Sequence, residues 1–481
     1  MAPRSKRTTS RSLMGFLCLC GTGLVWAGSA AGQTSSISLQ DLSAFRDAGS
    51  SWQVAGNVSA DLNKQDVLFP ASGNGVLVNL PDKRHPGKDL YSAAAYGDMD
   101  LELDYMMAPG ANSGIYLQGR YEIQLLDSWS VKTPTSADNG GIYERWDDSR
   151  PQGQQGYEGY APRVNASRAP GLWQHIKISF QAPRFDAAGK KIENARILRI
   201  VLNGVMIHED VALQGVTRGG GEEQATGPLR LQGDHGAVAF RNIQVTTYPK
   251  GRNEAERTDR RDEVDPILVD APATTLLRSF MDVPGGPRIV HAISVGSPEQ
   301  VHYTYDLDRG MLVQVWRGGF LDATPMWHDR GNGCSRPRGT VQYLGKPAFT
   351  LATLGNADAA WPADTAGTGY RPRGYVLDAN DRPTFKYDVY GSQVTDAIRV
   401  MADGHGITRE LTVTQPAPGL YAKLAEGSAI EVSKDMYVVD GRAYYLQLED
   451  AGGLQPVIRK SGERQELLVP VKGKIRYSIL F

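Results

Sequence analysis

The segment Asn112–Asp127, NSGIYLQGRYEIQLLD, alternates between apolar and polar residues. The odd positions carry Ile115, Leu117, Tyr121, Ile123 and Leu125, and the even positions carry Tyr116, Gln118, Arg120, Glu122 and Gln124. A β-strand turns successive side chains to opposite faces, so this pattern predicts one apolar face and one polar face. A carboxylate, a guanidinium, amides and a phenol on one face are typical of a sugar-binding surface. Tyr116, Gln118 and Gln124 are therefore candidate substrate-binding residues.

Three residues are candidates for catalysis. Glu122 could serve as a general base or acid, or it could be a solvated strand residue. His235, in LQGDHG, follows an expected strand in a loop that could direct its imidazole to the polar face, as acid, base or metal ligand; an ordinary loop histidine is the alternative. Arg120 shares the expected face with Glu122 and could stabilise an anion, or form a structural ion pair with Glu122.

Further candidates for substrate binding lie elsewhere. Tyr143 and Trp146, in GGIYERWDD, could form a wall against a sugar ring, with core packing as the alternative. Trp173 lies on the polar side of an expected strand and could line the sheet or cover its edge. Gln232, close to His235, is included with these residues. Asp127 falls in line with the apolar face, so we expect a turn or cap there unless the strand bulges.

The sequence assigns no cofactor. It lacks H-E-x-x-H, a cysteine cluster and an EF-hand loop, and its RGGGEE segment lacks the Lys and Ser or Thr of a phosphate loop. A divalent cation is left open, and its ligands would come from distant residues such as Glu122 and His235.

The elements that must position these residues are predicted to be strands. Period-two alternation and hairpin turns, such as Asn203-Gly204, occur in both halves of the chain and predict an all-β protein with two β-sandwiches. A charged stretch, Tyr248–Pro266, separates the halves. We expect domains at residues 36–248 and 267–481, joined by a linker at 249–266.

The N-terminus has the order of a secretion signal. A basic stretch, MAPRSKRTTSRS, precedes the apolar LMGFLCLCGTGLVWAG and the small residues SAAGQ. This order predicts a cleaved signal peptide at residues 1–32, export to the periplasm or the cell exterior, and no membrane span after cleavage. Only Cys334 then remains, so no internal disulfide is expected.

The charge balance restricts the partners. With 52 basic and 53 acidic residues the net charge is -1, which argues against nucleic acid as a partner. The sequence does not indicate an oligomeric state.

Five segments together carry a resemblance to a known family. NSGIYLQGRYEIQLLD, GGIYERW, PGLWQHIKISF, RIVLNGV and GPLRLQGDHGAVAFRNIQV follow one another in the order and spacing of the 3-keto-disaccharide hydrolase-like family. The resemblance covers Gly49 to Thr247 and includes the family's YE-x-Q pattern at Tyr121–Gln124. It implies a concanavalin-like jelly-roll fold. The C-terminal half resembles the larger β-sandwich that accompanies such domains in exported bacterial proteins.

The resemblance also implies a reaction and a carbohydrate substrate. A ketone at C3 of a sugar acidifies the C2 proton, so a base can remove it and expel the C1 substituent, after which water adds. Glu122 or His235 would move the proton, and Arg120 would stabilise the enolate. The alternative is a carbohydrate-binding jelly-roll module without catalysis.

The C-terminal half contains one group of residues with similar chemistry, namely Trp316, Arg317, Trp327, His328 and Asp329. They could form a second carbohydrate pocket. The alternation in MLVQVWRGGF isolates no polar row, which favours an aromatic core followed by a turn.

Overall fold

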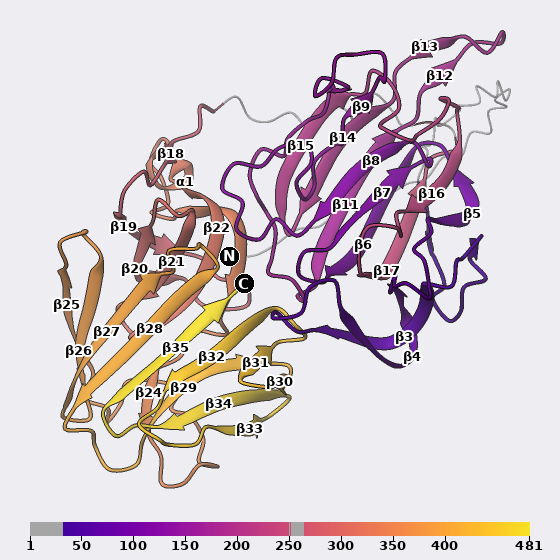
Figure 1. Ribbon diagram of the computed structural model, residues 1–481. Coiled ribbons are helices and arrows are strands. Elements are labelled where there is room, and N and C mark those ends of the chain that lie inside the picture. Colours follow the sequence, from indigo (N-terminus) through magenta and orange to yellow (C-terminus); the bar gives the residue numbers. More distant parts are fainter. Residues whose placement is uncertain (1–31, 250, 252–263) are drawn as a thin grey trace, which may run out of the picture.

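The computed structural model describes residues 32–249, 251 and 264–481. The expected signal peptide, except for Gly32, and most of the expected linker lie outside these residues. The described chain folds into two β-sandwiches that lie beside each other (Figure 1), so the all-β prediction is confirmed. Its helix is a single turn, α1 (Thr324–Trp327). None of the described helical residues forms a segment long and apolar enough to cross a membrane.

The first sandwich contains an eight-stranded sheet in the order β15-β14-β11-β6-β17-β4-β3, with β1 paired to β17. Its strands are β1 (Gln33–Ser36), β3 (Trp52–Ala60), β4 (Leu68–Asn79), β6 (Met99–Met107), β11 (Gln174–Gln181), β14 (Arg196–Leu202), β15 (Val205–Ala212) and β17 (Val238–Thr247). Asn203 and Gly204 form the turn between β14 and β15 with φ angles of 51° and 84°. Positive φ at both positions is the backbone of a tight hairpin turn, as the sequence predicts.

The opposing sheet has five strands in the order β2-β5-β16-β7-β8. Its strands are β2 (Phe45–Arg46), β5 (Leu90–Tyr96), β7 (Asn112–Leu117), β8 (Tyr121–Leu126) and β16 (Gly227–Leu231). Two short ribbons extend from the sandwich: β9 (Arg145–Trp146) pairs with β10 (Gly156–Tyr157), and β12 (Arg184–Phe185) pairs with β13 (Lys191–Glu193).

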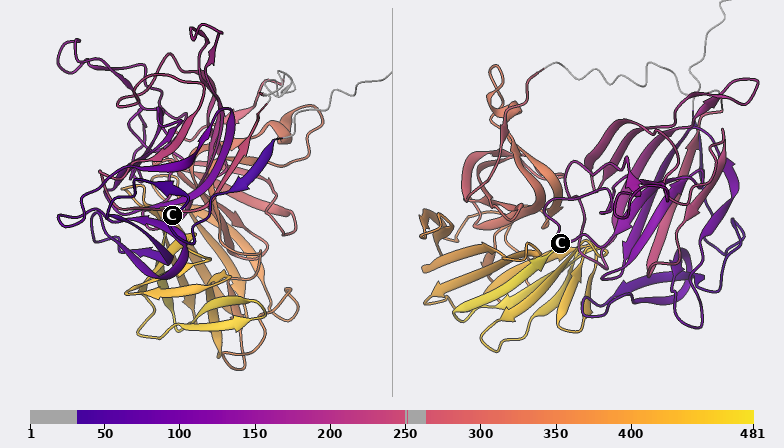
Figure 2. Two further views of the ribbon diagram at one scale, coloured as in Figure 1. Left: turned by 90° about the vertical axis from the view of Figure 1, so that its right-hand side faces the viewer. Right: turned by 45° about the horizontal axis from the view of Figure 1, so that its top comes forward.

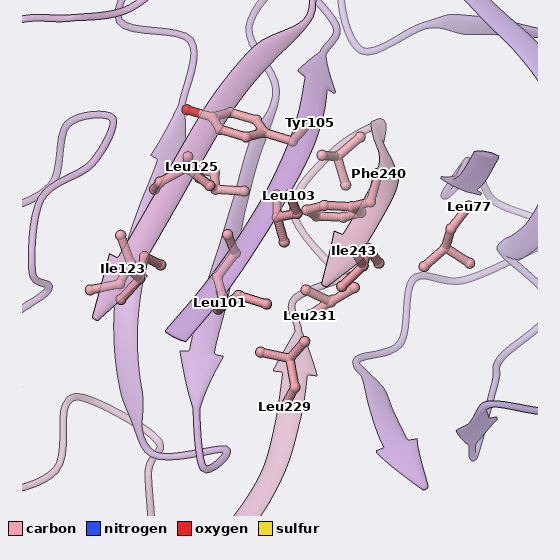
Figure 3. Close-up of a cluster of buried hydrophobic side chains, with 14 of the residues drawn as sticks. Leu77, Leu101, Leu103, Tyr105, Ile123, Leu125, Leu229, Leu231, Phe240 and Ile243 are labelled. Atoms are coloured by element: carbon pink, nitrogen blue, oxygen red, sulfur yellow. The ribbon is translucent and has the colours of Figure 1, made fainter. Parts of the chain in front are cut away.

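The core of the first sandwich lies between these two sheets. Figure 3 shows Leu101, Leu103 and Tyr105 of β6 near Ile123 and Leu125 of β8. All five side chains are buried. Alternate residues of these strands point into this core, where their apolar surface is removed from water. The residues between them point to the outer face of each sheet.

The second sandwich is built from three sheets. The eight-stranded sheet contains β25 (Arg371–Leu377), β26 (Pro383–Val389), β27 (Ser392–Val400), β28 (Gly406–Thr414), β30 (Ile430–Ser433), β31 (Met436–Val439), β32 (Tyr444–Asp450) and β35 (Lys474–Leu480). A six-stranded sheet contains β18 (Leu268–Val269), β19 (Thr275–Met281), β20 (Ile289–Gly296), β21 (Val301–Asp306), β22 (Met311–Asp322) and β23 (Arg336–Tyr343). The four-stranded sheet contains β24 (Leu351–Thr353), β29 (Leu420–Gly427), β33 (Val457–Ser461) and β34 (Arg464–Pro470).

The two sandwiches contact each other near the end of β35, and the right view of Figure 2 shows the C-terminus between them. The Trp129 indole N–H donates to the carbonyl of Phe481 over 2.8 Å. The Tyr445 hydroxyl donates to the carbonyl of Pro170 over 2.9 Å. The ring of Tyr445 packs in an apolar cluster that also contains Leu172 of the first sandwich. Buried apolar contact and hydrogen bonds therefore join the halves directly, in addition to the chain connection.

The aromatic group of the C-terminal half does not form one surface. Trp316 is fully buried and stacks on Phe320 with ring centroids 6.0 Å apart. Arg317 is also buried, whereas Trp327 in α1 is 48% exposed. Trp316 therefore belongs to a core, and Trp327 lies apart from it at the surface.

Candidate functional site

A row of side chains crosses the outer face of the five-stranded sheet. Glu122 of β8 lies opposite Tyr116 of β7, which lies opposite Arg230 of β16, and Arg230 lies opposite Tyr91 of β5. The N–H of Tyr143 donates to the carbonyl of Glu122 over 3.0 Å, which adds Tyr143 at the β8 end of the row. We call these five residues the cross-strand row.

Strand alternation puts the row on this face. Ile123 in β8, with Leu229 and Leu231 in β16, points into the core, so the residues next to them point outward. The sheet register then aligns outward residues of neighbouring strands within contact distance. Residues that are far apart in sequence, such as Glu122 and Arg230, thereby come to share one site.

Glu122 is the carboxyl of the row, and its pKa is strongly raised. Its side chain is only 3% exposed, and burial raises its pKa to about 7. A hydrogen bond with the Tyr116 hydroxyl and the charge of Arg230 act in the opposite direction. The carboxylate leans over Gly114, where an added Cβ would collide with Oε1 of Glu122. A carboxyl with a pKa near 7 can both accept and donate a proton at neutral pH.

Arg230 supplies the positive charge of the row. Its Nε donates to Oδ2 of Asp89 over 2.6 Å, and its guanidinium lies 4.0 Å from the centre of the Tyr116 ring. Asp89 also accepts a hydrogen bond of 3.1 Å from the N–H of Gly233. The ion pair thus connects the row to the loop that carries His235.

His235 lies at the margin of the row and is half exposed. Its Nδ1 lies 2.5 Å from Oδ1 of Asp234, and it is near enough to Glu122 for its charge to lower the pKa of that carboxyl. Gln232, three residues earlier, donates its N–H to the carbonyl of Gly114 over 2.9 Å. The Oε1 atom of Gln232 is buried and has no hydrogen-bond partner among the described residues.

An aromatic wall stands at the β8 end of the row. The guanidinium of Arg218 lies 3.8 Å from the centre of the Trp146 ring and forms a hydrogen bond with Tyr143. The indole N–H of Trp146 donates to Asp148 over 2.7 Å, which fixes the ring orientation. Such a wall offers a stacking surface for a sugar ring.

Two of the expected site residues lie instead in the turn between β7 and β8. Gln118 has a positive φ of 55°, and its amide donates to the carbonyls of Tyr96 and Ala225. Arg120 donates to the carbonyls of Gln118 and Glu222. The expectation that Arg120 shares the face of Glu122 is wrong, because the turn interrupts the strand alternation at Gln118. Arg230 takes the place beside Glu122.

Gln124 shares the outer face with Glu122, two residues along β8, and its buried amide donates to Asn112 over 3.1 Å. Two other residues lie away from the row. Asp127 accepts a hydrogen bond of 2.9 Å from the N–H of Gly110, as expected of a turn residue. Trp173 lies on the outer face of the eight-stranded sheet, with Arg241 over its ring at 3.9 Å. Because Glu122 lies on the outer face of the opposite sheet, Trp173 cannot join its site.

The sequence leaves open a divalent cation held by residues such as Glu122 and His235. In the part of the chain that the structure describes, no three His, Cys, Asp or Glu side chains are grouped so that they could hold a metal ion.

Several residues of the site were not recognised from the sequence, namely Asp89, Tyr91, Arg218 and Arg230. The signal for Arg230 was present in GPLRLQ, where Leu229 and Leu231 alternate with Arg230 and Gln232. Asp89 and Arg218 belong to no such pattern, because each lies outside a regular strand.

The raised pKa of Glu122 predicts a pH-dependent cost in stability. In the unfolded chain a glutamate has a pKa of about 4.3, so between that pH and about 7 the folded protein binds more protons and loses stability as pH rises. We expect Glu122→Gln to be more stable than the parent protein by about 1–3 kcal/mol at pH 8 and similar to it at pH 4.5. Denaturant midpoints at both pH values would measure this. Glu102→Gln, on the other sheet, is the matched control, and an equal difference at both pH values would contradict the expectation.

The fold and the site together define a class. A jelly-roll sandwich that presents a carboxyl, an arginine and aromatic rings on one sheet face is typical of carbohydrate-active domains of the glycoside hydrolase type. Residues 37–246 match the family of the 3-keto-alpha-glucoside-1,2-lyase-like domain. The resemblance seen in the sequence is therefore confirmed over these residues.

Solved structures with similarity to the chain include two proteins of Parabacteroides distasonis ATCC 8503 that are assigned as glycosyl hydrolases. The first is 26% identical, with 44% of this chain and 82% of the other covered and a TM-score of 0.31. The second is 16% identical, with 45% and 99% covered and a TM-score of 0.29. The transglycosylase Crh5 in complex with NAG is 12% identical, with 46% and 87% covered and a TM-score of 0.24. No curated protein matches the chain.

Proposed function

We propose that the first domain cleaves glycosides whose sugar carries a ketone at C3. The observation that carries this proposal is the buried Glu122, with a pKa of about 7, between Tyr116 and Tyr143 and close to Arg230. A base of this strength is suited to remove a carbon-bound proton that a neighbouring ketone has acidified. The description of the family that residues 37–246 match also supports it.

The reaction proceeds by elimination and hydration. Ionised Glu122 takes the C2 proton, and the electron pair of the C2–H bond moves toward C3, so that negative charge develops on the ketone oxygen. Arg230 and the Tyr116 hydroxyl stabilise this enolate. When the enolate collapses, the bond from C1 to the leaving oxygen breaks, and His235 donates a proton to that oxygen. Water then adds to C1 of the enone and gives one proton to His235, which replaces the proton that the leaving oxygen took, while C2 recovers its proton from Glu122.

The neighbours of Glu122 favour this route over that of an ordinary glycosidase. Common glycosidases place two working carboxyl groups on either side of an oxocarbenium-like centre. Asp89, an acidic residue next to the row, is engaged by Arg230 at 2.6 Å and by the N–H of Gly233 at 3.1 Å. Glu122 instead faces phenols and a guanidinium, which are groups that stabilise an enolate.

The substrate test compares a 3-keto disaccharide with its unoxidised parent. We expect the purified protein to release free sugar from the keto form only, because without the ketone the C2 proton is far too weakly acidic for a carboxylate to remove. The release is measured by chromatography of the products over time. Release from the unoxidised parent would indicate an ordinary glycosidase. Binding of both sugars without release would indicate a carbohydrate-binding module.

A further inference from the structure

A cavity of about 300 Å³ lies where the two sandwiches meet, away from the cross-strand row. The first sandwich contributes Arg168, Trp173 and Arg241 to its lining, and the second contributes the turn that contains Asp440 and Arg442. The N–H of Trp173 and the carbonyl of Arg442 are 3.4 Å apart, so the two domains are in direct contact at its edge.

Two of the lining arginines have incomplete sets of partners. The guanidinium of Arg168 has no hydrogen-bond or ion-pair partner among residues 32–249, 251 and 264–481. The side chain is half-buried, and this burial lowers its pKa, although the charge of Asp104 opposes this. Arg442 is 6% exposed and donates from Nη2 to Glu431 over 2.9 Å. Its Nε and Nη1 atoms are buried and have no partner in the described chain.

The carboxylates of the cavity are already engaged. Asp104 accepts hydrogen bonds from Nδ1 of His175 at 2.8 Å and from Nε of Arg241 at 3.1 Å. The hydrogen bond to Asp104 raises the pKa of His175, which favours the charged imidazole. Asp440 accepts a hydrogen bond of 2.8 Å from the N–H of Ser428. Positive charge on the lining therefore exceeds negative charge, and Arg168 is left uncompensated.

An arginine keeps its proton at any pH at which a protein is folded, so it cannot relieve burial by becoming neutral. A charge that is partly removed from water, as that of Arg168 is, or buried with unpartnered N–H groups, as that of Arg442 is, has lost hydration that a counter-charge can replace. We propose that this cavity binds an anionic group of the size of a carboxylate, a sulfate or a phosphate, with Arg168 as its main ligand. Because the second sandwich contributes Arg442, the bound anion would also strengthen the contact between the domains.

The test is thermal unfolding of the full chain at constant ionic strength, with sodium chloride replaced stepwise by sodium sulfate, sodium phosphate or sodium glucuronate. We expect at least one of the three to raise the unfolding midpoint by about 2–4 °C in a saturable manner. A response to glucuronate but not to neutral glucose would identify an acidic sugar, and a response to sulfate or phosphate alone would identify an inorganic anion or its ester.

Two variants separate a binding role of Arg168 from a structural one. Arg168→Gln should abolish the response and should not lower the midpoint in chloride, because it removes an unpaired charge. Arg199→Gln, an exposed arginine on β14, should respond as the parent protein does. The proposal is overturned if none of the anions gives a saturable rise, if Arg168→Gln responds like the parent, or if Arg168→Gln is destabilised in chloride.

Discussion

Replacing Glu122 with Gln should lower kcat for a 3-keto disaccharide by about 10²–10⁴-fold, the range typical of general acid and base catalysis. The amide has nearly the shape of the carboxyl group but cannot accept the C2 proton. Since Glu122 contributes little to holding the sugar in the proposed mechanism, KM should change much less than kcat. Steady-state kinetics on the parent protein and the variant would measure both constants.

The pH profile gives a second readout of the same group. Because only the ionised carboxyl is a base, kcat/KM of the parent protein should rise with pH through about 7, which is the pKa to which burial raises Glu122. The control Glu102→Gln should leave the profile unchanged. If Glu122→Gln keeps more than a tenth of the parent kcat while folding normally, Glu122 is not the base, and a carbohydrate-binding role or another proton acceptor follows.

Replacing Arg230 with Gln should lower kcat/KM by about 10²–10³-fold, which is the usual effect of removing one group that stabilises a developing oxyanion. Arg230 lies against the Tyr116 ring and is the cation of the cross-strand row. The substitution also leaves Asp89 without its ion-pair partner at 2.6 Å, so a loss of stability should accompany the loss of activity. Kinetics and denaturant midpoints would be measured on the same preparations.

The companion variant Asp89→Asn distinguishes the two effects. It disrupts the ion pair but keeps the guanidinium beside Glu122, so it should lower kcat/KM far less than Arg230→Gln does. The double variant should regain stability relative to Arg230→Gln, because no carboxylate is then left unpaired, but it should not regain activity. If Asp89→Asn and Arg230→Gln lowered kcat/KM equally, the arginine would act only by positioning the loop before His235.

The sequence predicts the structure best for features that depend on one strand or one turn alone. Ile115, Leu117, Ile123 and Leu125 are buried, as their alternation predicts, because the side-chain period of a strand is fixed by its backbone. The turn at Asn203-Gly204 is equally local, since the tight hairpin backbone needs positive φ and these two residues adopt it readily.

The structure differs from the prediction where strand alternation ends or where the position of a strand in the sheets matters. The alternation predicts that Gln118 and Arg120 continue the polar face, but these residues form a turn, and side chains in a turn do not follow the two-residue period of a strand. Trp173 follows the period of its own strand correctly, yet that strand belongs to the other sheet. Period-two patterning shows that a residue points outward but not which sheet carries it.

The sequence by itself determined that the chain is all-β, which residues of each strand face the core, and that Glu122 lies on a polar face. Only the tertiary structure decided that Arg230 and Tyr143 accompany Glu122, because the order and register of β8, β7 and β16 arise from contacts between distant segments. The pKa of Glu122 was likewise decided by folding. Desolvation of a carboxyl depends on how many atoms surround it from every side, and no property of its neighbours in sequence specifies that.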